Sequence, residues 1–155
     1  SSWTASPSPA PARVTQTVGQ PRAKIGFPSE DKIMNWEISF DEKENILLVK
    51  TSGILNMAST KALVNEGIEV IKKKNCRRCL VDNSKIESQN IGTFEIYSIP
   101  NLFDELGVPR GLHIASVTLE KYAKDFGFLE TVCQNRGYMV SLFYDVESAL
   151  QWLRQ

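Results

Sequence analysis

The chain has 155 residues, with 18 basic and 18 acidic side chains and one histidine, so its formal net charge is zero. Hydrophobic residues make up 42% of the sequence and charged residues 23%, which is ordinary for a globular domain with a buried core. The balanced charge argues against a general nucleic-acid-binding protein, and no apolar run approaches the roughly 20 residues that span a bilayer. Three cysteines cannot form a disulfide framework, so we expect a reducing compartment, the cytoplasm.

The first 33 residues differ in composition from the rest. Five of the seven prolines lie here: Pro7, Pro9, Pro11, Pro21 and Pro28. Prolines remove backbone donors, and the few apolar side chains cannot offset the ordering entropy, so residues 1–33 are expected to be a disordered leader or linker. A basic, acid-poor composition leaves a transit peptide open. A linker foreign to the domain, with Met34 as the natural start, is the simpler interpretation.

Residues 34–155 are expected to form one domain, slightly acidic with 14 basic and 16 acidic side chains. Apolar and polar residues alternate over 36–40, which predicts a half-buried strand. The apolar run 46–49 predicts a second strand. Because residues 41–45 form only a short polar connection, we expect an antiparallel hairpin.

A helix and a buried strand are predicted next. Ser59 is expected to cap a helix that ends near Lys73, where a basic last turn suits the helix dipole. The short apolar run 79–81 predicts a buried strand. Residues 82–85 are polar and are expected to leave the sheet.

The following helix is expected to begin at Thr93. Pro100 lies inside its apolar pattern, which predicts a kink or a restart there. Gly107 and Pro109 are expected to end it.

The remainder alternates between strands and helices. A strand is predicted over 112–117, a helix over 121–136 with an apolar stripe, and a strand over 139–143. Asp145 is expected to cap a last helix. Alternating strands and helices imply right-handed crossovers, so the predicted fold is α/β, with a mixed, mostly parallel five-stranded sheet covered by helices and an antiparallel first strand.

Eight short stretches follow one another in a characteristic order and spacing across residues 36–153. They are residues 79–84, 91–97, 106–110, 114–117, 128–132, 135–138, 143–149 and 152–153. Their order resembles that of the SpoIIAA-like family, which is related to the sulphate-transporter and anti-sigma-factor-antagonist (STAS) domain. The resemblance implies a non-catalytic regulatory module that binds a protein partner.

The resemblance also implies where such a module would be switched. Anti-sigma antagonists are phosphorylated on a serine or threonine in an Asp-Ser-Ser-Gly-like turn, which follows the central strand and opens the next helix. Asp82 and Ser84 match the strand end, but isoleucine and glycine at 91–92 occupy the hydroxyl positions. We therefore expect the usual serine phosphoswitch to be absent, with Ser88 and Thr93 as nearby substitute hydroxyls.

The segment 82–93 is the best candidate site. In open α/β sheets, ligands bind beyond the carboxyl ends of the strands, and a helix start offers free N–H groups. The candidate partner- or ligand-binding residues are Asp82, Asn83, Ser84, Ser88, Thr93, Phe94 and Tyr97. The alternative is that the polar members merely cap and terminate elements.

Aromatic residues on the two helices predicted after Thr93 suggest a second hypothesis. Phe126 and Phe128 lie about 200° apart around a helix, so they cannot both face the sheet. One of them lines a groove or partner surface, or is partly exposed without a function. Since the related CRAL-TRIO carriers hold lipids in a helix-lined pocket, the second hypothesis is a carrier or sensor of a small apolar or amphipathic ligand between the aromatic helices.

A third hypothesis, a thiol redox enzyme, rests on the CxxC motif of Cys76 and Cys79. Redox chemistry favours a cysteine at a helix N-terminus, whereas this pair follows a helix and enters a strand, so buried packing is preferred. With only Cys133 and His113 as further ligands, a zinc site is not expected, and His113 is better explained as a hydrogen-bonded sheet residue. No catalytic motif is present, so we expect no enzyme, cofactor or metal.

Basic residues at 72–74 and 77–78 form a short cluster. It is either a solvated helix end or a contact for an acidic partner or an anionic membrane surface. The sequence leaves the oligomeric state open, a homodimer included.

Overall fold

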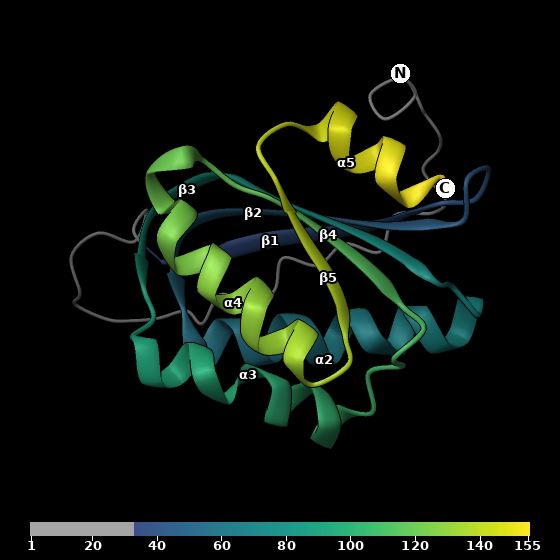
Figure 1. Cartoon of the computed structure of the whole chain (residues 1–155). Helices are drawn as coiled ribbons and strands as arrows, with labels where there is room; N and C mark the ends of the chain where they lie inside the picture. The colour runs from purple at the N-terminus through teal and green to yellow at the C-terminus, as the bar shows by residue number, and fades with distance from the viewer. Residues whose placement is uncertain (1–32) are drawn as a thin grey trace.

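Five strands form one mixed sheet in the computed structural model, which describes residues 33–155 (Figure 1). The strands follow one another across the sheet in chain order: β1 (Asn35–Asp41), β2 (Ile46–Asn56), β3 (Arg78–Asn90), β4 (His113–Val117) and β5 (Met139–Phe143). Only β1 runs antiparallel to its neighbour. This confirms the predicted sheet. The leader predicted for residues 1–33 lies, apart from Ile33, outside the described residues.

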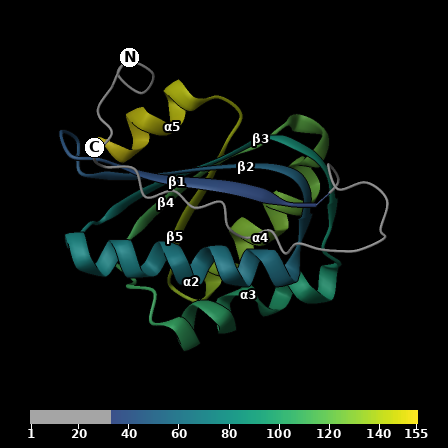
Figure 2. The ribbon, with the colours of Figure 1, turned by 180° about the vertical axis from the view of Figure 1, so that it is seen from behind.

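Helices cover both faces of the sheet unequally. On one face lie α2 (Met57–Lys74), α3 (Thr93–Leu106) and α4 (Ala123–Asn135), the last preceded by the short 3₁₀ helix η3 (Glu120–Tyr122). The opposite face carries α5 (Val146–Leu153) (Figure 1 and Figure 2). Because successive side chains of a strand alternate between faces, each strand contributes to two separate cores. The smaller core joins Leu80, Ala115 and Val117 to α5.

The predicted hairpin is confirmed. Ile38 pairs with Val49, and the connecting turn closes with Asn45 in the left-handed region at φ 61°. The Asp41 carboxylate accepts hydrogen bonds from the backbone N–H groups of Lys43 and Glu44 at 2.9 and 3.0 Å. The turn therefore satisfies its own donors, as short polar turns do.

Of the three predicted helix caps, Ser59, Thr93 and Asp145, only Asp145 is confirmed. Asn56, not Ser59, caps α2, because the Asn56 side chain accepts from the Ser59 N–H at 2.8 Å. Asp145 caps α5 as predicted, accepting from the Ser148 N–H at 2.7 Å. In both helices an Asn or Asp side chain accepts a hydrogen bond from the backbone N–H of the third residue after it.

The predicted restart of the helix at Pro100 and the predicted end of the strand after residue 81 do not occur. Helix α3 continues through Pro100 without a restart, because Pro100 is buried in the core and its packing offsets the lost backbone hydrogen bond. Strand β3 does not leave the sheet after residue 81 but runs to Asn90, paired with β2 as far as Asn56. Asn83 and Ile86 are buried along this extension, so tertiary pairing outweighs the polar composition of residues 82–90.

The pairing of β2 with the longer strand β3 is interrupted at two positions. The register between the two strands shifts at Lys50/Ser52 and again at Gly53/Ile54. Gly53 has φ +88°, and a Cβ atom there would lie 1.9 Å from the carbonyl oxygen of Ile33. The backbone of Ile33 thus passes so close to β2 at Gly53 that only glycine fits there.

Candidate functional site

The polar residues expected in a loop lie instead on the extension of β3. Asn83 is buried, and its Oδ1 accepts a hydrogen bond of 2.6 Å from the Thr51 hydroxyl of β2. Its Nδ2 donates to the Ser116 hydroxyl of β4 at 3.4 Å. Asn83 therefore joins three neighbouring strands by side-chain hydrogen bonds inside the protein, out of reach of a macromolecular partner.

The other candidates on β3 are more accessible. The Asp82 carboxylate accepts from the Ser84 backbone N–H at 3.0 Å, and both side chains are half-buried. Ser88 is exposed near the end of the strand. The structure therefore separates the candidates on β3 into one buried residue, Asn83, and three that reach the surface.

Gly92, not Thr93, is the N-cap of α3. Gly92 has the extended backbone that a cap requires, at φ −78° and ψ 168°, whereas Thr93 is already helical and exposed. The Glu95 carboxylate accepts from the Gly92 N–H at 3.0 Å. Because Glu95 brings a negative charge to this helix end, the first turn of α3 is a poor site for a second anion.

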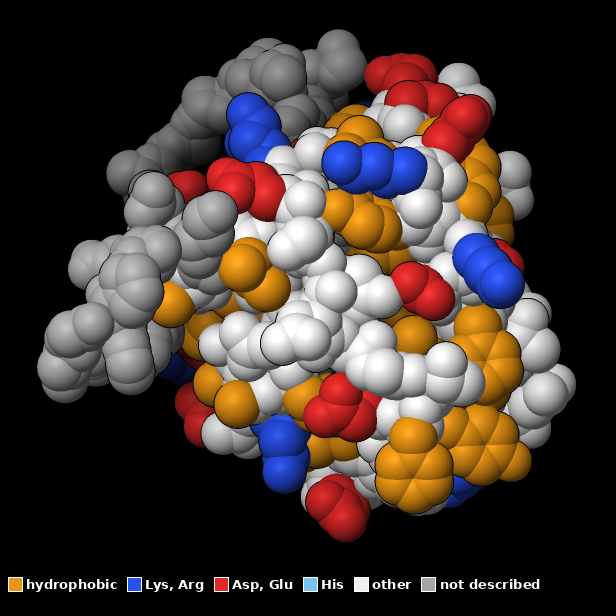
Figure 3. All heavy atoms as spheres, turned by 90° about the vertical axis from the view of Figure 1, so that its left-hand side faces the viewer, with side chains coloured by type: hydrophobic (Ala, Val, Ile, Leu, Met, Phe, Trp, Pro, Cys, Tyr) orange, Lys and Arg blue, Asp and Glu red, His pale blue; other side chains and the backbone are white. Residues whose placement is uncertain are grey.

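Three aromatic side chains at the start of α3 and on α4 form what we call the aromatic surface: Phe94, Tyr97 and Phe128. Phe94 is 84% exposed and Tyr97 64% exposed, the two highest values among the large hydrophobic residues of the described chain. The Tyr97 ring stacks on that of Phe128, with 6.4 Å between centroids and 13° between planes. Figure 3 views the end of the molecule where α3 begins, and hydrophobic side chains gather in its lower part.

The aromatic surface contributes little to the stability of the isolated protein, because its exposed rings gain almost nothing from burial. A phenylalanine left in water forgoes about 2 kcal/mol relative to a buried one, and exposed apolar groups of this kind mark interaction sites. The backbone beneath is held in place, since the Tyr122 hydroxyl donates to the Glu87 carbonyl at 2.7 Å and Gln89 bonds Asp125. The end of β3 thus anchors the start of α4 beside the aromatic surface.

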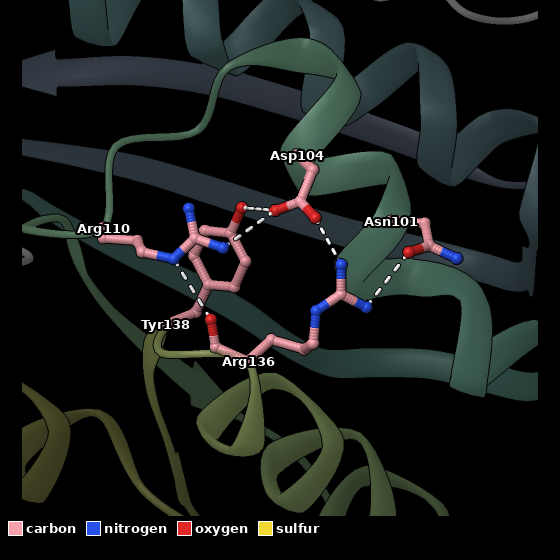
Figure 4. A network of polar contacts seen from close by, with 5 residues as sticks. All are labelled: Asn101, Asp104, Arg110, Arg136 and Tyr138. Atoms are coloured by element: carbon pink, nitrogen blue, oxygen red, sulfur yellow. Dashed lines mark hydrogen bonds and ion pairs between the residues drawn. The ribbon is translucent and has the colours of Figure 1, made fainter.

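A second polar cluster lies at the other end of α3 (Figure 4). Asp104 accepts hydrogen bonds from the Tyr138 hydroxyl, from Arg136, and from Arg110 at 3.0 Å. Arg136 also donates to the Asn101 side chain at 3.0 Å. The Tyr138 hydrogen bond, together with the two guanidinium groups, holds the pKa of Asp104 below its usual value. The cluster fastens α3 to the segments that precede β4 and β5.

The same cluster raises the pKa of Tyr138 to about 12, first because of burial and then because its hydroxyl donates to Asp104. The Arg110 guanidinium lies over the Tyr138 ring, 4.4 Å from its centroid. No local sequence pattern indicated the contacts of this cluster, because their members are as many as 35 residues apart.

The three cysteines are buried and free. Burial raises the pKa of Cys76 and Cys79, and raises that of Cys133 to about 12. The Cys76 thiol donates to the Arg78 carbonyl at 3.0 Å. Protonated, buried thiols are poor nucleophiles, so the geometry favours packing for the CxxC motif.

His113 is the first residue of β4. Its Nδ1 lies 3.2 Å from the Gly111 carbonyl oxygen, and its ring contacts Trp152 with 5.4 Å between centroids. Residues 33–155 contain no group of three or more histidine, cysteine, aspartate or glutamate residues that could hold a metal ion. Over the same residues, no helix is long and apolar enough to cross a membrane.

A cavity of about 170 Å³ lies between the sheet and the three helices α2, α3 and α4. Ile99 and Phe103 of α3 and Phe126 of α4 contribute to its wall, together with side chains of α2 and of the strands. The two aromatic helices therefore face the cavity on one side and carry the aromatic surface on the other.

Comparisons with known proteins identify the fold. No protein-family model matches the sequence, and no curated protein sequence matches it significantly. Among solved structures, the chain is similar to an anti-sigma factor antagonist from Mycobacterium paratuberculosis, with a TM-score of 0.55 and 14% sequence identity. The match covers 82% of this chain and 99% of that chain. It confirms the predicted SpoIIAA/STAS-type fold.

Proposed function

We propose that this chain is a non-catalytic regulatory module that binds a protein partner through the aromatic surface. The observation that carries the proposal is the exposure of Phe94 and Tyr97 on one helix, beside the end of β3, which hydrogen bonds join to η3 and α4. Aromatic side chains dominate the energetics of protein interfaces, because they bury much area at little conformational cost. The shared fold with an anti-sigma factor antagonist supports a regulatory protein as the partner.

The chemistry of the surface describes that partner. Two rings in contact with water require an apolar groove with room for both, in which they become desolvated. Thr93 is exposed beside them, Ser88 is exposed near the end of β3, and Ser84 lies in the middle of that strand. We include these hydroxyls and Asp82 as polar contacts around the apolar centre, and give Asn83 the role of fixing the strands beneath.

The usual serine phosphoswitch is left out of this proposal. Ile91 is buried in the core and Gly92 serves as the cap of α3, so both hydroxyl positions of the family turn have structural occupants here. Thr93 is the substitute hydroxyl nearest to the family turn, and it lies in the first turn of α3. Glu95 opposes a phosphate there with like charge in the same turn.

Quantitative co-purification tests the proposal. The tagged full chain is compared with a Phe94→Ser, Tyr97→Ser double variant in extracts of the native source. The matched control is Tyr144→Ser, which removes another exposed aromatic ring, 49% exposed and outside the aromatic surface. A partner retained by the wild type and the control should fall at least about tenfold with the double variant. Equal recovery with all three chains refutes the role of the aromatic surface.

A second candidate function is a carrier or sensor of a small apolar or amphipathic ligand. The cavity between the sheet and the aromatic helices favours this function, because apolar side chains such as Ile99, Phe103 and Phe126 line it. Native mass spectrometry of the protein purified from its own source tests it. A retained molecule supports the candidate, and repeated absence of one contradicts it.

A further inference from the structure

On the face of the sheet that carries α2, α3 and α4, some side chains are not fully enclosed by the helices. Val81 of β3 and Ile114 of β4 lie on central strands beneath the helices, yet both are only half-buried. Their neighbours on the opposite face, Leu80 and Ala115, are 0% exposed. Both half-buried residues line the cavity, which accounts for the accessible surface that they keep.

The packing of α3 explains the cavity. This helix packs mainly against α4 and α2, as Figure 1 and Figure 2 show, and its Ile99 and Phe103 line the cavity. Small residues stand where larger ones would fill the space, namely Gly67 on α2 and Cys133 on α4. Protein interiors are otherwise close-packed, so a space of this size needs such a cause.

The wall of the cavity is almost entirely apolar. Among the residues that line it in the described chain, only Thr60, Asn83 and Ser116 are polar. The Thr60 hydroxyl donates to the Asn56 carbonyl at 2.7 Å, and the other two bond each other. The cavity therefore offers no strong partner to a charged group, whose desolvation would go uncompensated.

Its volume sets the size of an occupant. An apolar cavity of about 150 Å³ in another protein binds benzene or xenon, whereas pockets for drug-sized ligands measure about 300–1,000 Å³. At about 170 Å³, this cavity matches the first class. A long acyl chain exceeds it.

We propose that the cavity beneath α3 is a binding site for a neutral, apolar molecule about the size of a single six-membered ring. The inference rests on the second candidate function and narrows its ligand class. Ile99 and Phe103 would contact the occupant from the inner side of the helix that bears Phe94 and Tyr97. Occupancy therefore stabilises the support of the aromatic surface.

Benzene and toluene are the probes, with benzoate and decanoate as charged and long-chain comparisons. In the full chain, either neutral ring at ten times its Kd should raise the Tm by about 3–6 °C. It should also shift the methyl resonances of Ile99 and Ile114 in NMR spectra. Benzoate and decanoate should do neither.

A matched pair of variants on α2 locates the binding. Val64 lines the cavity, and Val70 is equally half-buried outside it, so Val64→Phe should abolish the shifts and Val70→Phe should keep them. If Val64→Phe does not fold, Cys133→Leu fills the space from α4 instead.

The failures are distinguishable. Wild-type protein that gives no response to either neutral ring overturns the inference. Binding of decanoate in preference to benzene overturns the ligand class and leaves the second candidate function standing. Ring binding that survives both cavity-filling variants overturns the location.

Discussion

The carboxylate of Glu130 accepts a hydrogen bond of 2.9 Å from the backbone N–H of Leu142, so a side chain of α4 occupies the open edge of the sheet. One turn along the same helix, Gln134 donates to the Val140 carbonyl at 2.7 Å. Strand β5 is an edge strand, and unpaired backbone groups at such an edge invite pairing with another chain. The two side chains thus satisfy groups that would otherwise recruit a neighbour.

The first prediction concerns this edge. The double variant Glu130→Ala, Gln134→Ala frees one donor and one acceptor of β5, so self-association should increase. Analytical ultracentrifugation over a concentration series measures the effect. Glu105→Ala, an exposed acidic residue on α3, is the control and should match the wild type. A double variant that sediments like the control would show that the edge is protected by other means.

Two glycines give opposite predictions for the same substitution. Gly67 lies inside α2, and an added Cβ would meet the Leu47 side chain at an ordinary 3.6 Å. Gly67→Ala should therefore raise the unfolding free energy by about 0.5–1 kcal/mol, the helix-propensity difference. Gly53→Ala should lower it by more than about 1 kcal/mol, because of its positive φ and the 1.9 Å approach to Ile33. Urea unfolding at pH 7 measures both, and a Gly53→Ala variant as stable as the wild type would contradict the close approach of Ile33 to Gly53.

The buried Asn83 should matter for stability more than its exposed neighbour on β3. Asn83→Ala removes the buried hydrogen bonds to the hydroxyls of Thr51 and Ser116, and leaves Thr51 only the longer contact of 3.4 Å with the Asp82 carbonyl, which costs about 1–3 kcal/mol. Ser88→Ala should change the unfolding free energy by less than about 0.5 kcal/mol. Equal effects of the two substitutions would remove the structural role assigned to Asn83.

Because the pKa of Asp104 is lowered in the folded protein, we expect the free energy of unfolding to fall in acid. The hydrogen bond from Tyr138 and the two arginines hold its folded-state pKa below the unfolded value of about 3.9. The unfolded chain therefore takes up this proton first as the pH falls. The stabilisation is complete above about pH 5 and is lost as the pH drops through the folded-state pKa.

Urea unfolding at pH 7 and pH 3 tests that sign. The wild type should lose more unfolding free energy between the two conditions than Asp104→Asn, which cannot titrate. Glu105→Gln, one residue further along α3, serves as the control and should lose as much as the wild type. An Asp104→Asn variant as acid-sensitive as the wild type would contradict the assignment.

The sequence predicted what local patterns encode. Alternation at Trp36, Ile38 and Phe40 located β1, and the Asp145 cap located α5. Residues 82–90 carry no such pattern, because their strand structure depends on pairing with β2 across two bulges. The sequence therefore identified the elements and their order but placed the candidate residues in a loop.

The candidate site divides in the same way. Phe94 and Tyr97 were selected as aromatic residues of the helix predicted from Thr93, and the structure brings Phe128 of α4 against Tyr97. Asp104 and Tyr138 were missed, since a contact between residues 34 apart is fixed by tertiary packing alone. The cavity likewise reflects how far α3 stands from the strands, which no residue pattern records.

Strand order equals chain order across the whole sheet, and this has a consequence for how the protein folds. Each new strand joins an edge that already exists, so no strand has to insert between two earlier ones. Contacts between neighbouring strands therefore close comparatively short loops, which lowers the contact order and favours rapid folding. Assembly can proceed from β1 toward β5 as the chain leaves the ribosome, and the side chains that protect the last edge are synthesised immediately before it.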